Sequence, residues 1–215
     1  MFLLLTCFTW GNGSQGQLGQ GGDADTVLVP TALRSFTNRP VRSLSSGFRH
    51  SALVADDGAC YTFGSNDDGA LGHTKRRTRP ETVDSLEAFS IEQIAAGSRH
   101  TVALTKDGMV FTWGASDRGQ LGLGLDAMLN GGDGGSDHKF ARPQRVRALD
   151  GVPVVQVATG DNHVLALDTS GTVWAWGDNA EGQLGIGTFA ASHSPVHVSG
   201  LRGVPIVRVA CGSVH

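Results

Sequence analysis

The sequence predicts an all-β fold, a partial β-propeller of about four blades in which each blade is a small antiparallel sheet. Glycine accounts for 31 of the 215 residues, although 40% of the residues are hydrophobic. That glycine content is about twice the usual share of roughly 7%. One glycine-punctuated motif occurs four times along the chain. A packed fold with many tight turns and repeated sheets explains these observations.

The repeat is defined by landmarks at fixed intervals. Six residues after the aromatic residue of an aromatic-Gly pair comes Gly-x-Leu-Gly, and a later proline precedes a Gly-x-x-His motif by 17 residues. The aromatic residues are Trp10, Phe63, Trp113 and Trp176, and the motif histidines are His50, His100, His163 and His215. Such periodicity is typical of repeat architectures. It predicts units at approximately 1–46, 47–96, 97–159 and 160–211 within a single domain, 1–215.

Each unit has the pattern of short strands joined by tight turns. The runs 154–158, 163–167 and 172–176 are rich in β-branched and aromatic residues. Asp57-Gly58, Asp107-Gly108 and Ser170-Gly171 lie between such runs, where a tight hairpin requires positive φ. A sheet this small must stack on its neighbours to bury its faces. We therefore expect the repeated aromatic residues to be structural, and the histidines to cap backbone groups at blade turns.

Only the stretch between Gly-x-Leu-Gly and the proline varies in length, and this identifies it as a surface loop. Its longest copy is an insertion loop at 123–142, whose tract 130–138 we expect to be a flexible loop rather than a calcium site. Another copy carries a basic patch formed by Lys75, Arg76, Arg77 and Arg79. This patch has two interpretations, a solvated loop or a site for nuclear import or an acidic partner. The solvated loop is the favoured one.

Charge and cysteine content argue against several classes of protein. The net charge of -3 provides no global attraction to nucleic acid or to an anionic membrane. Cys7, Cys60 and Cys211 are widely spaced, which indicates neither a disulfide framework nor a zinc site. No stretch approaches the roughly 20 apolar residues that span a bilayer. We expect an intracellular protein, cytoplasmic or nuclear and not secreted, without a membrane partner.

Catalytic motifs are not found in the sequence. It contains no G-x-S-x-G elbow, P-loop or HExxH. One histidine per blade spreads these side chains around a ring, whereas zinc ligands must converge on one ion. We therefore expect no catalytic residue, metal or cofactor, and a protein that is not an enzyme.

The repeated motifs resemble those of the regulator of chromosome condensation repeat family. The segments that carry the resemblance are WGNGSQGQLGQG, FGSNDDGALG, WGASDRGQLGLG and WGDNAEGQLGIG, together with SGFRHSALVADDG, AGSRHTVALTKDG and TGDNHVLALDTSG. Their order is most similar to the first four blades of the family's guanine-nucleotide exchange factor for Ran. The resemblance implies a complete ring of seven blades. Because the chain ends at His215, within a unit, we expect a fragment or an open arc whose sheet edges favour self-association.

Departures from the family's motifs argue against three specific activities. Exchange on Ran implies an acidic residue after a motif glycine, where this chain has Ser98, with Asp161 one blade later, and a wedge insertion that the Trp113–Gly119 interval lacks. Chromatin binding implies a basic N-terminal tail and a long fourth loop, neither of which is seen. Light reception implies clustered tryptophans at positions occupied by Phe48 and its counterparts in the other blades.

Two functions of different classes remain. The first is a non-catalytic scaffold that binds a protein partner through blade loops. Its candidate residues vary between repeats while the flanking glycine and histidine do not: Phe48, Arg49, Ser98, Arg99, Asp161 and Asn162. The alternative is a guanine-nucleotide exchange factor for a Ran-type small GTPase, which would then be the partner.

Overall fold

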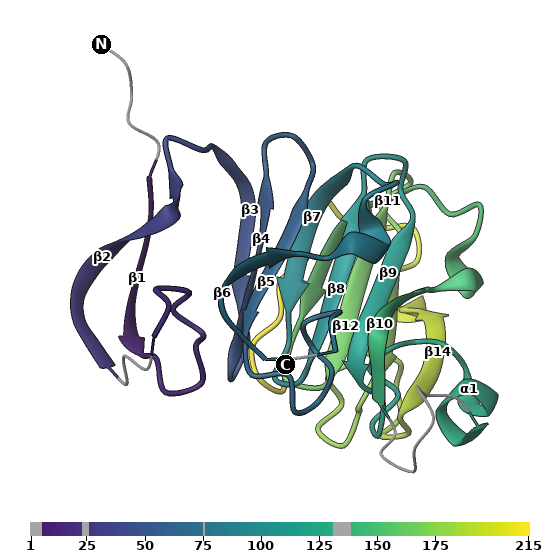
Figure 1. Cartoon of the computed structure of the whole chain (residues 1–215). Coiled ribbons are helices and arrows are strands. Elements are labelled where there is room, and N and C mark those ends of the chain that lie inside the picture. Colours follow the sequence, from purple (N-terminus) through teal and green to yellow (C-terminus); the bar gives the residue numbers. More distant parts are fainter. Residues whose placement is uncertain (1–5, 23–25, 75, 131–138) are drawn as a thin grey trace.

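The structure is a computed structural model that describes residues 6–22, 26–74, 76–130 and 139–215. Its strands form antiparallel sheets that follow one another in chain order, from the first sheet in purple to the last in yellow (Figure 1). The prediction of an all-β partial propeller is confirmed. We number the sheets as blades, and three of them have four strands while the first has two. No helix in the described ranges is long and apolar enough to cross a membrane.

The strands have these bounds. The first blade pairs β1 (Thr6–Asn12) with β2 (Thr26–Thr37), and the second contains β3 (Val41–Ser46), β4 (His50–Ala55), β5 (Cys60–Gly64) and β6 (Arg77–Thr82). The third contains β7 (Ile91–Ala96), β8 (His100–Thr105), β9 (Val110–Ala115) and β10 (Lys139–Arg145). The fourth contains β11 (Val154–Thr159), β12 (His163–Asp168), β13 (Val173–Gly177) and β14 (Ser192–His197). Short helices are α1 (Leu125–Asn130), η1 (Asp84–Leu86), η2 (Arg147–Leu149) and η3 (Ser199–Leu201).

Each four-stranded blade is a meander in which consecutive strands pair. The predicted hairpin glycines Gly58, Gly108 and Gly171 have φ values of +85°, +81° and +81°, as tight hairpin turns require. A blade begins one strand before its Gly-x-x-His turn, so β7 pairs with β8 although it closes the sequence unit 47–96. The first strands β3, β7 and β11 lie next to one another from blade to blade.

Repeated aromatic side chains fill the seams between blades. Trp113 and Trp176 are completely buried, and each packs with residues of the preceding blade. The Trp113 Nε1 donates to the carbonyl of Ala70 at 2.8 Å, and the Trp176 Nε1 donates to that of Gln120 at 3.0 Å. Both carbonyls belong to the second residue of Gly-x-Leu-Gly in the preceding blade. Trp10 of the first blade is 58% exposed.

Glutamine side chains connect the first strands of neighbouring blades. The Gln93 Nε2 donates to the Val157 carbonyl at 2.9 Å, and its Oε1 accepts from the Val157 N–H at 2.9 Å. Gln156 makes the same pair of bonds with Val209, at 2.8 and 3.0 Å. An amide side chain offers the same donor and acceptor as a peptide group. It can therefore join two first strands in place of a direct backbone ladder.

Replacing Gln93 with alanine is expected to lower the free energy of unfolding by about 1–3 kcal/mol, because both backbone groups of Val157 lose their partners in a half-buried seam. Urea denaturation measures the change. The matched control is Gln144→Ala, whose exposed amide donates to the nearby Arg142 carbonyl, and which should change stability by less than about 0.5 kcal/mol. Equal effects of the two substitutions would contradict a role for the Gln93 amide in joining blades.

Candidate functional site

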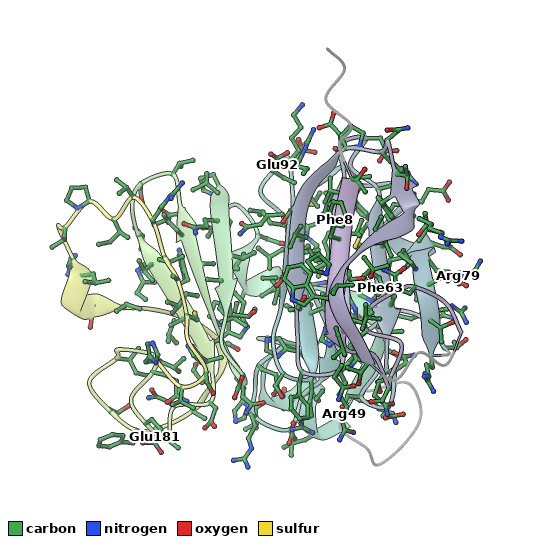
Figure 2. All side chains as sticks on the ribbon, turned by 90° about the vertical axis from the view of Figure 1, so that its left-hand side faces the viewer. Phe8, Arg49, Phe63, Arg79, Glu92 and Glu181 are labelled. Carbon is green, nitrogen blue, oxygen red and sulfur yellow. The ribbon has the colours of Figure 1, made fainter. Side chains whose placement is uncertain are left out.

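The Gly-x-x-His turns of successive blades gather on one face of the propeller. We define the turn face as residues 47–49, 97–99, 160–162 and 212–214 together with the loops 65–69, 115–119 and 178–182. Figure 2 shows Arg49 and Glu181 toward one end of the sheets and Glu92 at the opposite end. Backbone hydrogen bonds run from the N–H of Phe48 to the carbonyl of Ser98 at 3.4 Å, and from Ser98 to Asp161 at 3.1 Å. The Asp161 N–H continues this chain to Ser213 at 2.9 Å. The turns that carry the predicted binding residues are therefore joined continuously across this face.

The motif glycines are required by close packing on this face. A Cβ atom on Gly97 would lie 2.1 Å from Cε1 of His100 and 2.8 Å from the carbonyl oxygen of Gly160 in the next blade. Gly47 and Gly160 have the same two kinds of neighbour, their own motif histidine and the next motif glycine. The repeated Gly-x-x-His spacing thus brings the turns of neighbouring blades into direct contact.

His50 and His100 do not cap backbone groups as expected. The His50 Nε2 lies 2.9 Å from the Thr101 hydroxyl, which itself donates to the Ala70 carbonyl at 2.8 Å. Within the described chain, both ring nitrogens of His100 are buried without a partner. The residue that corresponds to Thr101 in the next blade is Val164, which has no hydroxyl. His50 therefore bonds a side chain of the next blade rather than capping backbone, and His100 does neither.

Burial keeps these imidazoles neutral. Loss of solvation lowers the pKa of His50 to about 4 and that of His100 to about 3. The pKa of His163 is also lowered, mainly by burial. At neutral pH these rings carry no charge, so the charges of the turn face come from the exposed side chains beside them.

Arg99 is held by two carboxylates. Its Nη2 donates to both oxygens of Asp117, at 2.9 and 2.7 Å, and its Nη1 lies 3.5 Å from the Oδ1 of Asp68. Burial alone would raise the pKa of Asp117, but the bonds from Arg99 and Gln120 lower it. Asp68 follows β5 and Asp117 follows β9. Arg99 therefore connects the loops of the second and third blades.

Arg49 has the same place in the preceding turn but a different environment. No ion pair of Arg49 is found in the part of the chain that the structure describes. Its guanidinium carbon lies 5.3 Å from the centre of the Phe48 ring, within the range of a cation–π contact. Phe48 is 69% exposed. An aromatic ring and an arginine are thus presented together at the surface.

A groove of about 350 Å³ joins these two arginines. Its lining includes Phe48, Arg49, Ser98, Arg99, Asp67 and Asp68. Four of the six predicted binding residues line it, while Asp161 and Asn162 lie on the next turn. Asp67 and Asp68 were missed; for Asp67 the signal was that FGSNDDG and WGASDRG have an acid at the same position, three residues after the glycine. Hollows between the hairpin and the short helix recur in each four-stranded blade, with volumes of about 260 Å³ at Gly58, 240 Å³ at Gly108 and 800 Å³ at Gly171.

The predicted basic patch is mostly engaged in contacts within the fold. Arg76 donates to the carbonyls of Ser14 and Gln15, both at 3.1 Å, and so attaches β6 to the first blade. Arg77 pairs with Glu81, and Arg79 lies against Gly21. Lys75 is outside the described residues. The part of the insertion loop at 131–138 is outside them as well, whereas α1 lies within the insertion and contacts β14.

Comparison with known proteins identifies the repeat. The model of the regulator of chromosome condensation (RCC1) repeat matches residues 6–54, 57–104, 107–167 and 170–215. The chain belongs to the RCC1 repeat family. A shorter model of the same repeat matches 41–70, 91–120 and 154–183.

Several relatives of this RCC1-repeat chain are much longer proteins. It is 49% identical over 208 residues to the probable E3 ubiquitin-protein ligase HERC4 of Homo sapiens, covering 96% of this chain but 19% of that protein. It is 38% identical over 212 residues to the E3 ubiquitin-protein ligase HERC2 of Homo sapiens, covering 97% of this chain and 4% of that protein. The chain thus spans about a fifth or less of these two relatives.

A solved structure with the same fold is Prp20p from Saccharomyces cerevisiae. Its TM-score is 0.80 with 24% sequence identity, covering 95% of this chain and 49% of that chain. At this identity the similarity shows the fold alone.

The relatives correct one prediction from the sequence. The expectation that the protein is not an enzyme is wrong, because HERC4 and HERC2 are named as E3 ubiquitin-protein ligases. The RCC1-repeat segment shared with them is only a small part of each protein. The absence of catalytic motifs within such a segment therefore says nothing about the activity of a longer chain.

Proposed function

We propose that this RCC1-repeat chain is the partner-recognition part of an E3 ubiquitin-protein ligase, and that it brings a protein partner to the ligase through the turn face. The observation that carries the proposal is the 49% identity to HERC4 over 96% of the chain. The partner is a protein, as expected from the loop-rich surface, and the setting is intracellular.

The turn face has the properties of a protein-binding surface. Aromatic and arginine side chains are enriched at the centres of protein interfaces, and Phe48 and Arg49 are exposed beside a groove. The turns that present them are joined by backbone hydrogen bonds across blades. A surface that is held in this way loses little conformational entropy when a partner binds.

Substituting Phe48 with alanine in the full-length protein is expected to reduce ubiquitin transfer to a captured partner by about tenfold, the loss typical of a central aromatic contact. Discharge of ubiquitin to free lysine should be unchanged, because that step needs no partner. The control is Leu201→Ala, a 36% exposed residue of η3 beside the hairpin at the opposite end of the blade. Quantitative proteomics of ubiquitinated proteins identifies the partners.

Deletion of residues 6–215 provides the decisive comparison. An unchanged set of ubiquitinated proteins after this deletion would overturn the proposal. Exchange on a Ran-type GTPase stays a prediction, because Prp20p, whose binding to Gsp1p and histones has been characterised, shares only the fold at 24% identity. Release of labelled GDP in the presence of the full-length protein tests that alternative.

A further inference from the structure

Arg49 and Arg99 occupy the same position in consecutive turns, one residue before the motif histidine. Their surroundings can therefore be compared within a single molecule. Arg99 is neutralised from two sides, by Asp117 of its own blade and by Asp68 of the preceding blade. Asp117 is the third residue after Gly114, and Asp68 is the fourth residue after Gly64.

The corresponding residues at Arg49 do not neutralise it. The third residue after Gly64 is Asp67, whose Oδ2 accepts from the Ser65 hydroxyl at 2.8 Å. The fourth residue after Gly11 is Gln15, which has no charge. Among the described residues, neither forms an ion pair with Arg49. At Arg49, one of the two carboxylates is thus replaced by the neutral Gln15. The other, Asp67, accepts a hydrogen bond from Ser65.

The remaining turns offer no equivalent cation. Asn162 and Val214 stand at the corresponding positions of the later turns. The charged side chains near the Arg49 end of the groove are Arg49 and Asp67. Asp68 also lines the groove, but it pairs with Arg99. Arg76 adds a positive charge on the neighbouring loop, where it bonds the carbonyls of Ser14 and Gln15. Gln15 has the repeat position that Asp68 has at Arg99, and the positive charge of Arg76 at its carbonyl favours an anionic group there.

Phe48 adds an apolar contact beside this cation. Its ring is 69% exposed and lies under the Arg49 guanidinium. A guanidinium stacked on an aromatic ring keeps its edge free to donate in pairs to a carboxylate. The same site can therefore bind an apolar side chain on Phe48 and an acidic side chain on Arg49.

We propose that Phe48 and Arg49 form a binding site for an acidic segment of a protein partner, in which an Asp or Glu carboxylate pairs with Arg49 and an adjacent apolar residue packs on Phe48. The incoming carboxylate takes the role that Asp117 and Asp68 have at Arg99. This inference rests on the proposed function in one respect: both assume that the partner is a protein.

Selection from a random dodecapeptide phage library on the 215-residue chain tests this site. Selected peptides are expected to carry Asp or Glu next to an apolar residue, and Glu→Gln or Asp→Asn versions should bind about tenfold more weakly. Arg49→Gln should remove that difference, and Arg49→Glu should shift selection toward Lys and Arg. The control is Arg118→Gln, which removes a 59% exposed cation of the same face that lies 4.0 Å from Asp117.

Three results would overturn the inference: no peptide is selected, acidic and amide peptides bind equally, or Arg118→Gln weakens binding as much as Arg49→Gln. A dimer that dissociates on Arg49→Gln would also overturn it, since the occupant would then be a second copy of the chain. The inference and the proposed function fail separately. If peptides bind through Arg49 with a preference for acidic residues, but deletion of residues 6–215 leaves the ubiquitinated proteins unchanged, only the proposed function is wrong. If the deletion changes the ubiquitinated proteins but the peptides show no acidic preference, only the proposed site is wrong.

Discussion

Replacing Gly97 with alanine is expected to lower the free energy of unfolding by about 3 kcal/mol, the upper end for overpacking a closed interior. The new methyl group would lie 2.1 Å from the His100 ring and 2.8 Å from the Gly160 carbonyl oxygen. Neither neighbour can move freely, because the ring is buried and the carbonyl belongs to the next turn. Urea denaturation followed by tryptophan fluorescence measures the loss.

Two companion variants show whether the histidine ring is the obstacle. Gly200→Ala adds a methyl group with no atom within 4 Å, and it should change stability by less than about 0.5 kcal/mol. His100→Ala removes the ring that the methyl group meets. The double variant Gly97→Ala with His100→Ala should therefore be less destabilised than the sum of the single variants. Strict additivity would show that the ring does not require glycine at position 97.

Stability is expected to fall steeply as the pH is lowered from about 7 toward 4. The folded-state pKa values of His50 and His100, about 4 and about 3, lie below the usual histidine value of 6.5. Below pH 6.5 the unfolded chain therefore binds protons that the folded chain does not. Stability is present above this pH and is lost as the pH falls toward the folded values. Each such histidine contributes up to about 1.4 kcal/mol per pH unit.

Urea denaturation at pH values between 7.5 and 4.5 tests the effect. His100→Leu should reduce the slope by about the contribution of one group, because the ring nitrogens of His100 have no hydrogen-bond partner among the residues that the structure describes. The control is His197→Leu, which removes an exposed imidazole that meets the Trp174 ring edge-on. The pKa values of carboxylates such as Asp117 and Asp168 are lowered from the usual 3.8, so in the folded chain these groups titrate below this range. A slope unaffected by His100→Leu would contradict the assignment to buried histidines.

Some features followed from the sequence because they depend on local chemistry repeated at fixed intervals. The hairpins at Gly58 and Gly108, the alternating strands, and the propeller class all arise within one repeat, where neighbouring residues determine backbone conformation. The candidate binding residues were placed at the turns because they vary between invariant neighbours, and the structure has Phe48, Arg49 and Asp161 exposed there but Ser98, Arg99 and Asn162 half-buried.

Other features were decided by contacts between blades. Trp113 is buried against the blade that precedes it, whereas the equivalent Trp10 of the first blade is exposed. His50 has the Thr101 hydroxyl as its partner, while His100 faces the blade that has Val164 there. In both cases the deciding residue lies about one repeat away, and the repeat pattern alone does not say which blade covers which side chain.

The contrast between Arg49 and Arg99 has the same origin. Both arginines were predicted as equivalent binding residues, yet Asp68 and Asp117 neutralise only Arg99. Sequence alone determined the repeat, the turns and the variable positions within them, because these depend on neighbours in the chain. The tertiary structure decided which of those side chains keeps an unpaired charge, because that depends on loops brought together by the stacking of one blade on the next.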